Sequence, residues 1–396
     1  MEGKGVGNYD AILEDSMPGA PEAPSRSDFL LTPIWMAVAT TRRLRQGAGF
    51  SLMVTAMLLT AWALGFFDNP LLTIYDPELT ERHSDFKQLT GFDNVSTTGD
   101  GVGVCIVDSG IDADHPDLRN FELSGWKDFI NNRAEPYDDQ GHGTSMAGIL
   151  IAENMLKGIA PDVNLFVAKA IEKSGTGTDV DIAEAVDWCV TQDVDIISLS
   201  LGGGQGIDLI FLETDQLEES VDNAIDAGIF VVAAAGNDGG ANDDGDVASP
   251  GSVEDVICVG AIDTDGTMWS NSSVGDNGFN PPQNWNPLGR LDPDKKPELV
   301  APGEKLPILN ANSDMLYAWG SGTSGATVWV SGAIAHLLEH RPDLGHNGTS
   351  GGDRQTVEDV KDWVRNSVIP MDGQSGHDEY YGYGHLRVDT LLQEAS

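Results

Sequence analysis

The feature that most constrains the fold is a set of apolar runs of strand length between residues 102 and 261. These runs are VGVCIV at 102–107, VNLFVA at 163–168, VDIISL at 194–199, IFVVAAA at 229–235 and DVICVGA at 255–261. Helical patterns separate several of them, as in 180–190, where Ile182, Val186 and Cys189 share one face with Val190. Continuous apolar strands alternating with helices predict an α/β protein, with a mainly parallel central sheet and helices on both faces. Functional groups are then expected at the carboxyl ends of the strands.

The N-terminal region has a different character. Residues 48–67 read AGFSLMVTAMLLTAWALGFF without a charge, and about 20 apolar residues suffice for a helix to span a bilayer. Arg42, Arg43 and Arg45 precede this segment, which predicts a cytoplasmic N-terminus and an extracellular remainder. A cleaved twin-Arg export signal, which would make the protein secreted, is the alternative. We therefore expect a cytoplasmic acidic leader at 1–47, a membrane anchor at 48–67, a linker at 68–97 and one domain at 98–396.

The charge of the chain excludes some partners. Asp and Glu number 63 against 22 Lys and Arg, which gives a formal net charge of -41. Such a protein repels nucleic acids and anionic lipid surfaces. Because the carboxylates are scattered along the chain, we interpret them as the surface of a halophilic protein, whose self-repulsion concentrated salt would screen. A generic acidic protein is the alternative.

The three cysteines, Cys105, Cys189 and Cys258, each lie in an apolar stretch. A sparse, odd-numbered set does not indicate a disulfide framework. We predict buried thiols that pack as small hydrophobic side chains.

Two polar residues follow buried segments in patterns that suggest chemistry. Asp108 ends the run VCIVD ahead of Ser-Gly, a pattern that also occurs in aspartic proteases. That class needs two such carboxylates, and the chain has no second Asp-Ser/Thr-Gly. His142 lies between Gly141 and Gly143 at the start of a helical pattern, where the glycines let the backbone bend tightly around the ring.

Two further residues complete the pattern. Ser324 lies where the glycine-rich turn GSG gives way to a long apolar helix, so its N–H is near the positive end of the helix. Asn237 follows the run AAAG at a strand end. The order Asp108, His142, Ser324 is the order of the subtilisin arrangement of the catalytic triad.

From about Thr98 to Leu392, the chain resembles the subtilase family of serine proteases. The motifs that carry the resemblance are VDSGI and HPDL around Asp108, GHGT around His142, GIAP at 158–161, SLSLGG at 198–203, AAAGN at 233–237, SPGSVEDVICVGA at 249–261, APG at 301–303, GTS at 322–324 and YGYG at 381–384. The resemblance implies a subtilisin-like three-layer fold and an endopeptidase with Ser324 as nucleophile, His142 as general base and Asp108 as the residue that orients it. It implies that Asn237 stabilises the oxyanion.

The resemblance also implies how substrate binds. Ser200, Leu201 and Gly202 would pair with the backbone of a polypeptide substrate, and Ala234, Ala235 and Gly236 would line the pocket for the residue before the scissile bond. Asp238 could favour basic side chains there. The chemistry needs no cofactor. Structural calcium is common in the family, but we interpret the turn around Asp263, Asp265 and Gly266 as an ordinary surface turn, because the remaining ligands of a coordination shell are not readable. No metal ligand set is assigned, and we assume a monomer.

The sequence departs from the family at three positions. Gly325 and Val328 stand where the family usually has Met and Pro, and Ser145 where it commonly has His. None of these supplies a catalytic atom. Two other functions stay open: a degenerate subtilase that serves as a membrane-tethered peptide-binding module, and a structural or signalling membrane protein that only shares the fold.

Overall fold

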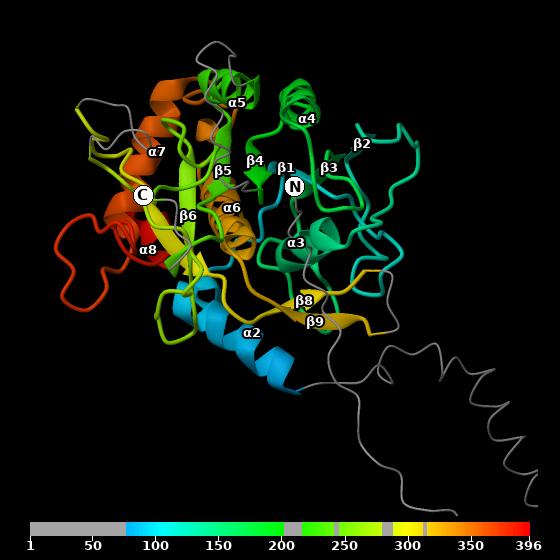
Figure 1. Cartoon of the computed structure of the whole chain (residues 1–396), viewed down its shortest axis with the longest axis horizontal. Coiled ribbons are helices and arrows are strands. Elements are labelled where there is room, and N and C mark those ends of the chain that lie inside the picture. The colour runs from blue at the N-terminus through cyan, green and yellow to red at the C-terminus, as the bar shows by residue number, and fades with distance from the viewer. Residues whose placement is uncertain (1–76, 202–215, 241–244, 279–287, 312–314) are drawn as a thin grey trace, which may run out of the picture. The chain divides into compact units, whose positions relative to one another are not determined.

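A computed structural model describes residues 77–201, 216–240, 245–278, 288–311 and 315–396 (Figure 1). The compact unit that contains them begins at Ile74 and ends at Ser396. The membrane anchor and leader expected at 1–67, and Gly202, lie outside the described residues. No helix within the described ranges is long and apolar enough to cross a membrane.

A seven-stranded parallel sheet forms the centre of the unit, in the order β2-β3-β1-β4-β5-β6-β7. All the expected apolar runs are strands of this sheet, and the two strands of the sheet that we did not predict are its edge strands, β2 and β7. The bounds are β1 (Gly103–Asp108), β2 (Gly125–Asp128), β3 (Asn164–Lys169), β4 (Ile196–Leu199), β5 (Phe230–Ala234), β6 (Ile257–Ile262) and β7 (Leu299–Pro302). The predicted α/β class with a mainly parallel sheet is confirmed.

Helices cover both faces of the sheet (Figure 1). Helix α3 (His142–Ile151) connects β2 to β3, α4 (Asp179–Thr191) connects β3 to β4, and α5 (Gln216–Asp226) connects β4 to β5, so all three crossovers run in the same direction along the sheet. Helices α4 and α5 pack against each other on one face of the sheet. The long helix α6 (Thr323–His340) packs against α3 and is buried from Thr323 to Leu338.

Smaller elements complete the unit. A hairpin of β8 (Leu306–Leu309) and β9 (Tyr317–Gly320) precedes α6 and packs against α3. The helices α7 (Arg354–Ser367) and α8 (Val388–Glu394) follow it in sequence. Two short 3-10 helices are η2 (Phe92–Asn94) and η4 (Pro342–Leu344).

The N-terminal boundary differs from the expected one, since much of the linker expected at 68–97 belongs to the packed unit. Helix α2 (Pro77–Thr90) lies beneath the β8–β9 hairpin in Figure 1. Its Phe86 is fully buried and, like Phe92 of η2, packs on Trp329 of α6, with ring centroids 6.2 and 5.4 Å away. The packing of α2 could not be predicted because its sequence is mostly polar and only a few of its side chains face the core.

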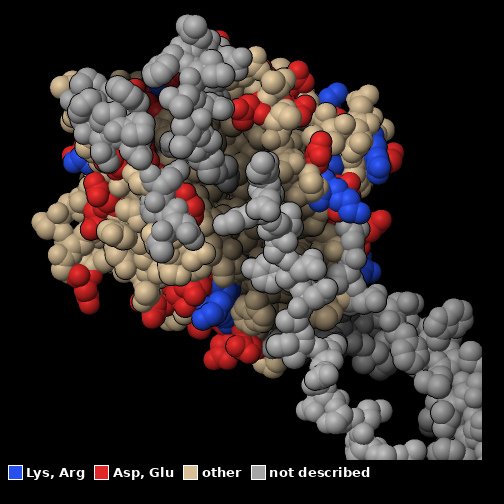
Figure 2. Space-filling model, in the orientation of Figure 1, with Lys and Arg blue, Asp and Glu red and all other residues tan. Residues whose placement is uncertain are grey.

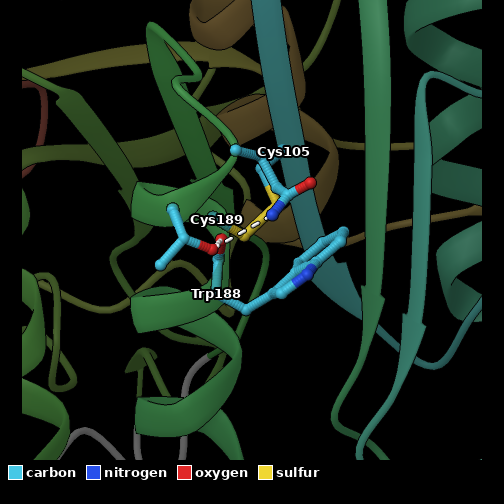
Figure 3. Close-up of a disulfide and its surroundings, with 5 residues drawn as sticks. Cys105, Trp188 and Cys189 are labelled. Atoms are coloured by element: carbon cyan, nitrogen blue, oxygen red, sulfur yellow. Dashed lines mark hydrogen bonds between the residues drawn. A yellow bond between two sulfur atoms is a disulfide. The ribbon is translucent and has the colours of Figure 1, made fainter.

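The cysteine prediction is wrong for one pair: Cys105 and Cys189 form a disulfide that joins β1 to α4 (Figure 3). Both residues are fully buried, and their Cα atoms are 5.9 Å apart. The pairing arises because α4 covers the face of β1 that carries Cys105. The sequence does not show this contact, since the two cysteines are 84 residues apart. Cys258 is a buried free thiol, as expected, and burial raises its pKa.

Carboxylates are scattered over the visible face of the unit, with few basic groups among them (Figure 2). Most basic side chains that the structure describes take part in ion pairs; Arg354, for example, bonds Asp222, Asp226 and Asp255. The basic side chains are too few to pair with every carboxylate, because the chain has 63 Asp and Glu against 22 Lys and Arg.

Candidate active site

Asp108 and His142 meet at the carboxyl end of the sheet. Asp108 is the last residue of β1 and is fully buried, and His142 is the first residue of α3. His142 Nδ1 lies 2.9 Å from both carboxylate oxygens of Asp108, and the backbone N–H of Ser109 donates to Asp108 Oδ1 at 2.6 Å. This arrangement fixes the ring with Nε2 as the free nitrogen, because Nδ1 carries the proton that the carboxylate accepts.

The charge around His142 favours its protonated form. Burial lowers the pKa of His142, but the Asp108 carboxylate and its hydrogen bond outweigh burial, and the net pKa is raised with a further contribution from Asp138. The side chain is 35% exposed, so one edge of the ring is accessible. An imidazole stabilised as its cation and open on one side is suited to accept a proton from an adjacent group.

Ser324 is the second residue of α6 and is anchored to the end of β4. Its hydroxyl donates to the backbone carbonyl of Ser200 at 3.0 Å, and the Ser200 hydroxyl donates to the carbonyl of Ser324 at 3.0 Å. Ser200 directly follows β4, the neighbour of β1 in the sheet, so Ser324 and Asp108 lie at ends of adjacent strands. In this structure the Ser324 hydroxyl is bonded to Ser200 rather than to His142. Catalytic hydrogen bonds commonly form only when substrate is bound.

Asn237 follows β5 and faces the start of α6. Its Oδ1 accepts hydrogen bonds from the backbone N–H of Thr323 at 2.9 Å and from Thr323 Oγ1 at 3.0 Å. These two donors fix the orientation of the amide, because only the oxygen can accept. The Nδ2 group is thereby the one available to a developing negative charge, and Asn237 itself is exposed.

The expected substrate-binding residues that the structure describes lie beside this site. Ser200 is 3% exposed, and Leu201 is half-buried. Ala234 and Ala235 are buried at the end of β5, and Gly236 adopts a φ of +114°, which favours glycine. The carboxylate of Asp238 accepts a hydrogen bond from Ser273, so its position is fixed.

The turn considered for calcium is used by protein groups. Asp263 forms an ion pair with Arg82 of α2, and Asp265 Oδ1 accepts from the backbone N–H of Thr267 at 2.8 Å. Across the described ranges, no three His, Cys, Asp or Glu side chains gather as metal ligands would. These contacts favour the ordinary turn that the sequence also allowed.

Two functional contacts escaped the sequence prediction. Thr323, which orients Asn237, is marked only by its place in the GTS motif. The segments of Asp108 and His142 also approach very closely: a Cβ atom on Gly143 would lie 2.2 Å from the carbonyl oxygen of Gly110, and one on Gly110 would lie 2.1 Å from that of Tyr137. The glycines beside both candidate residues are therefore required by contact between these two segments.

Comparison with known proteins agrees with this arrangement. The model of the subtilase family matches residues 99–384. Serine protease AprX of Bacillus subtilis is 36% identical over 326 residues, covering 74% of this chain and 67% of that protein. Subtilisin DY of Bacillus licheniformis is 31% identical over 298 residues, covering 74% and 92%. Among solved structures, a cold-adapted subtilisin-like serine proteinase is 24% identical with a TM-score of 0.55, over 74% of this chain and 89% of the other. The prenylagaramide maturation protease PagA is 22% identical with a TM-score of 0.57, over 78% and 98%. At these identities the two structures support the fold alone.

Proposed function

The chain belongs to the subtilase family of serine proteases and is a hydrolase, and from this premise we propose that Asp108, His142 and Ser324 are its catalytic triad. The observation that carries the proposal is the 2.9 Å contact of His142 Nδ1 with the buried carboxylate of Asp108. This contact leaves Nε2 free on the accessible side of the ring, as a general base requires.

The chemistry assigned to each group follows from its geometry. An alcohol is a weak nucleophile, so Ser324 attacks the scissile carbonyl as His142 takes its proton, and the protonated His142 then donates to the leaving amine. Asp108 holds the ring in the required tautomer and stabilises the imidazolium. Water then attacks the acyl carbon as His142 takes its proton, and His142 returns a proton to the Ser324 oxygen as the ester bond breaks and the carboxylic acid product leaves.

The developing oxyanion would be stabilised from two sides. Asn237 Nδ2 is one donor, because Thr323 occupies the oxygen of that amide. The backbone N–H of Ser324, near the positive end of α6, is the other. Replacing Asn237 by Ala should lower kcat by about 100- to 1000-fold with little change in KM. A change confined to KM would mean that Asn237 binds substrate instead.

We propose that polypeptides bind as an added strand along Ser200, Leu201 and Gly202, the last of which lies outside the described residues. The Ser200 carbonyl, which now accepts from Ser324, would then accept a substrate N–H, and the Ser324 hydroxyl would be released toward His142. Asp238 would favour a basic residue before the scissile bond, a preference that salt should weaken.

A serine-directed fluorophosphonate probe tests this function against the alternative of a degenerate peptide-binding module. The wild-type protein should be labelled at Ser324, and Ser324→Ala should lose labelling together with about five to six orders of magnitude in kcat on casein. Ser321→Ala is a matched control in the turn that precedes α6, and it should still be labelled. Unlabelled wild-type protein that nevertheless binds peptides would establish the degenerate module.

We further propose that residues 48–67 anchor the enzyme in the cell membrane with the protease unit outside. The Cys105–Cys189 disulfide supports an extracytoplasmic site, since disulfides persist mainly in oxidising compartments. The protease should pellet with membranes and be digested from outside intact cells. A soluble mature enzyme whose N-terminus follows residue 67 would establish the export-signal alternative.

A further inference from the structure

A second buried carboxylate, Asp138, lies behind the pair formed by Asp108 and His142. Asp138 is 3% exposed and precedes His142 by four residues. Its Oδ1 accepts from the backbone N–H groups of Gln140 and Gly141, at 3.1 and 2.7 Å. These bonds fold the chain that enters α3 around the carboxylate, because each would otherwise be an unpaired donor at the helix start.

The same carboxylate joins the residues that follow Asp108 and His142 in the chain. Ser109 Oγ donates to Asp138 Oδ1 at 2.9 Å, and Ser109 is the residue after Asp108. The backbone N–H and the hydroxyl of Thr144 donate to Asp138 Oδ2 at 2.9 and 2.7 Å, and Thr144 lies two residues after His142. One side chain therefore connects the end of β1 to the first turn of α3.

A second set of contacts supports the same junction. The backbone N–H of Gly143 donates to Ser109 Oγ at 2.9 Å, so Ser109 bridges Asp138 and the residue after His142. The fully buried Lys169, at the end of β3, donates to the Ser109 carbonyl at 2.6 Å and to Asp139 Oδ1 at 2.8 Å. Ser109 is held through both its side chain and its backbone.

We propose that Asp138 is a positioning residue of the protease, which holds Asp108 and His142 at their catalytic separation by clamping Ser109 and Thr144. This proposal rests on the triad assigned above. Asp138 itself touches no reacting atom. It acts because any rotation of the α3 entry relative to β1 must break bonds to one of its two oxygens.

Replacing Asp138 by Asn tests the clamp with almost no change in volume. Asn keeps one accepting oxygen and puts an amide where two donors of the clamp now point, so one half of the clamp must open. A displacement of about 1 Å in a catalytic group can cost on the order of 100-fold in rate. We expect kcat per labelled active site to fall about 10- to 100-fold, with KM nearly unchanged.

The pH profile gives a readout that a loss of stability alone would not move. The charged groups that act on His142 are Asp108 and Asp138, and the Lys169–Asp139 pair contacts the carbonyl of Ser109. Asp138→Asn removes one negative charge that favours the imidazolium, so the pKa of His142 should fall and the acidic limb of kcat/KM should move to lower pH.

Asp128→Asn is the matched control. Asp128 is 2% exposed, lies ten residues earlier in the chain, and accepts from the N–H groups of Ile130, Asn131 and Arg133 and from the hydroxyl of Tyr137. It is an equally buried carboxylate that bonds neither Ser109 nor Thr144. Asp128→Asn should lower the unfolding midpoint and leave both kcat and the acidic limb in place.

A second series tests the clamp without altering Asp138. Ser109→Ala and Thr144→Val should each lower kcat, and their combined effect should be smaller than the product of the two, because both act through one carboxylate. Thr144→Ser, which keeps the hydroxyl, should restore the rate. This series decides the question if Asp138→Asn does not fold.

The outcomes are distinct. Slower turnover in Asp138→Asn and Thr144→Val, with rescue by Thr144→Ser, would support the clamp. A lower unfolding midpoint with wild-type kcat and acidic limb in both variants would overturn it and make Asp138 a purely structural residue. If the fluorophosphonate probe labels no serine in the wild-type protein, the triad itself fails and the clamp fails with it. If the probe labels the wild-type protein but the variants keep the wild-type kcat and acidic limb, only the clamp is overturned and the triad stands.

Discussion

Gly325, which follows the proposed nucleophile Ser324, gives the sharpest prediction from packing. A Cβ atom at this position would lie 2.1 Å from Leu306 Cδ1 and 3.5 Å from Ile149 Cδ1. Leu306 comes from β8 and is 3% exposed, so it fills the space that a side chain at 325 would take. Position 325 therefore has no room for a side chain, because Leu306 already fills the space behind Ser324.

The sign of the effect of Gly325→Ala follows from two opposing terms. Alanine in place of glycine within a helix stabilises by roughly 0.5–1 kcal/mol. Overpacking a filled core costs about 1–3 kcal/mol. The cost is at the lower end of this range if the end of the Leu306 side chain rotates away. The difference between the two terms is a net loss of about 0–2.5 kcal/mol in the free energy of unfolding.

Leu306→Ala supplies the matched rescue. Alone it should cost about 2–5 kcal/mol, because it removes three buried carbons and leaves a cavity. The methyl of Gly325→Ala then enters that cavity, so the double variant should be at least 1 kcal/mol more stable than the sum of the single effects. This departure from additivity is the coupling free energy, and it measures the contact between positions 325 and 306.

Urea unfolding should be measured in a Ser324→Ala background, where autolysis cannot distort the transition. Equal slopes for the four proteins would show that the denatured states are comparable. The reasoning fails if Gly325→Ala is more stable than the parent protein, or if its effect adds simply to that of Leu306→Ala.

The same space governs sensitivity to peroxide. The wild-type enzyme has no side chain at 325 to oxidise, so its initial kcat should survive doses that oxidise exposed methionines. Gly325→Met should pack only together with Leu306→Ala, and this double variant should lose activity as its sulfoxide forms beside Ser324. Parallel loss of activity in both proteins, with the new methionine shown to be oxidised, would contradict the role of position 325.

Three further predictions concern stability. Removing the disulfide by Cys105→Ala with Cys189→Ala should cost on the order of 4 kcal/mol by loop entropy, and reductant should then no longer lower the unfolding midpoint. Burial lowers the pKa of His83 in α2 from 6.5 to about 4, although its ring bonds the Lys157 carbonyl. The unfolded chain thus binds more protons between these values, and stability should fall by roughly 3 kcal/mol from pH 6.5 to pH 4, a slope that His83→Gln should lack. Molar KCl should raise the unfolding midpoint by screening the exposed carboxylates, and equal midpoints in dilute buffer would remove the halophilic interpretation.

The central strands could be predicted because burial on both faces makes their sequences continuously apolar. The edge strands β2 and β7 could not. β2 reads GWKD, half-exposed and with a lysine, and β7 is only LVAP, which ends in proline. The sequence of β2 lacks an apolar signal because its burial is only partial. β7 is fully buried, and it was missed because a run of four residues that ends in proline is too short to stand out as a strand.

The candidate site divides in the same way. Asp108, His142, Ser324 and Asn237 stand in local motifs at strand ends and helix starts, so they could be named from the sequence. Asp138 and the Cys105–Cys189 pair depend on which segments touch after folding. A pattern along the chain carries no information on which helix covers a given strand or which loop closes on a carboxylate.

The acidic character of the chain has different consequences at the surface and at the site. Exposed carboxylates repel one another through water, where salt screens them within a Debye length of about 10 Å at 0.1 M. Asp108 and Asp138 are buried, and each accepts hydrogen bonds from groups fixed by the fold. Screening reaches such charges far less, so they continue to act on His142 when the surface is neutralised by counter-ions. Salt should therefore shift the unfolding midpoint strongly while the acidic limb of kcat/KM moves little.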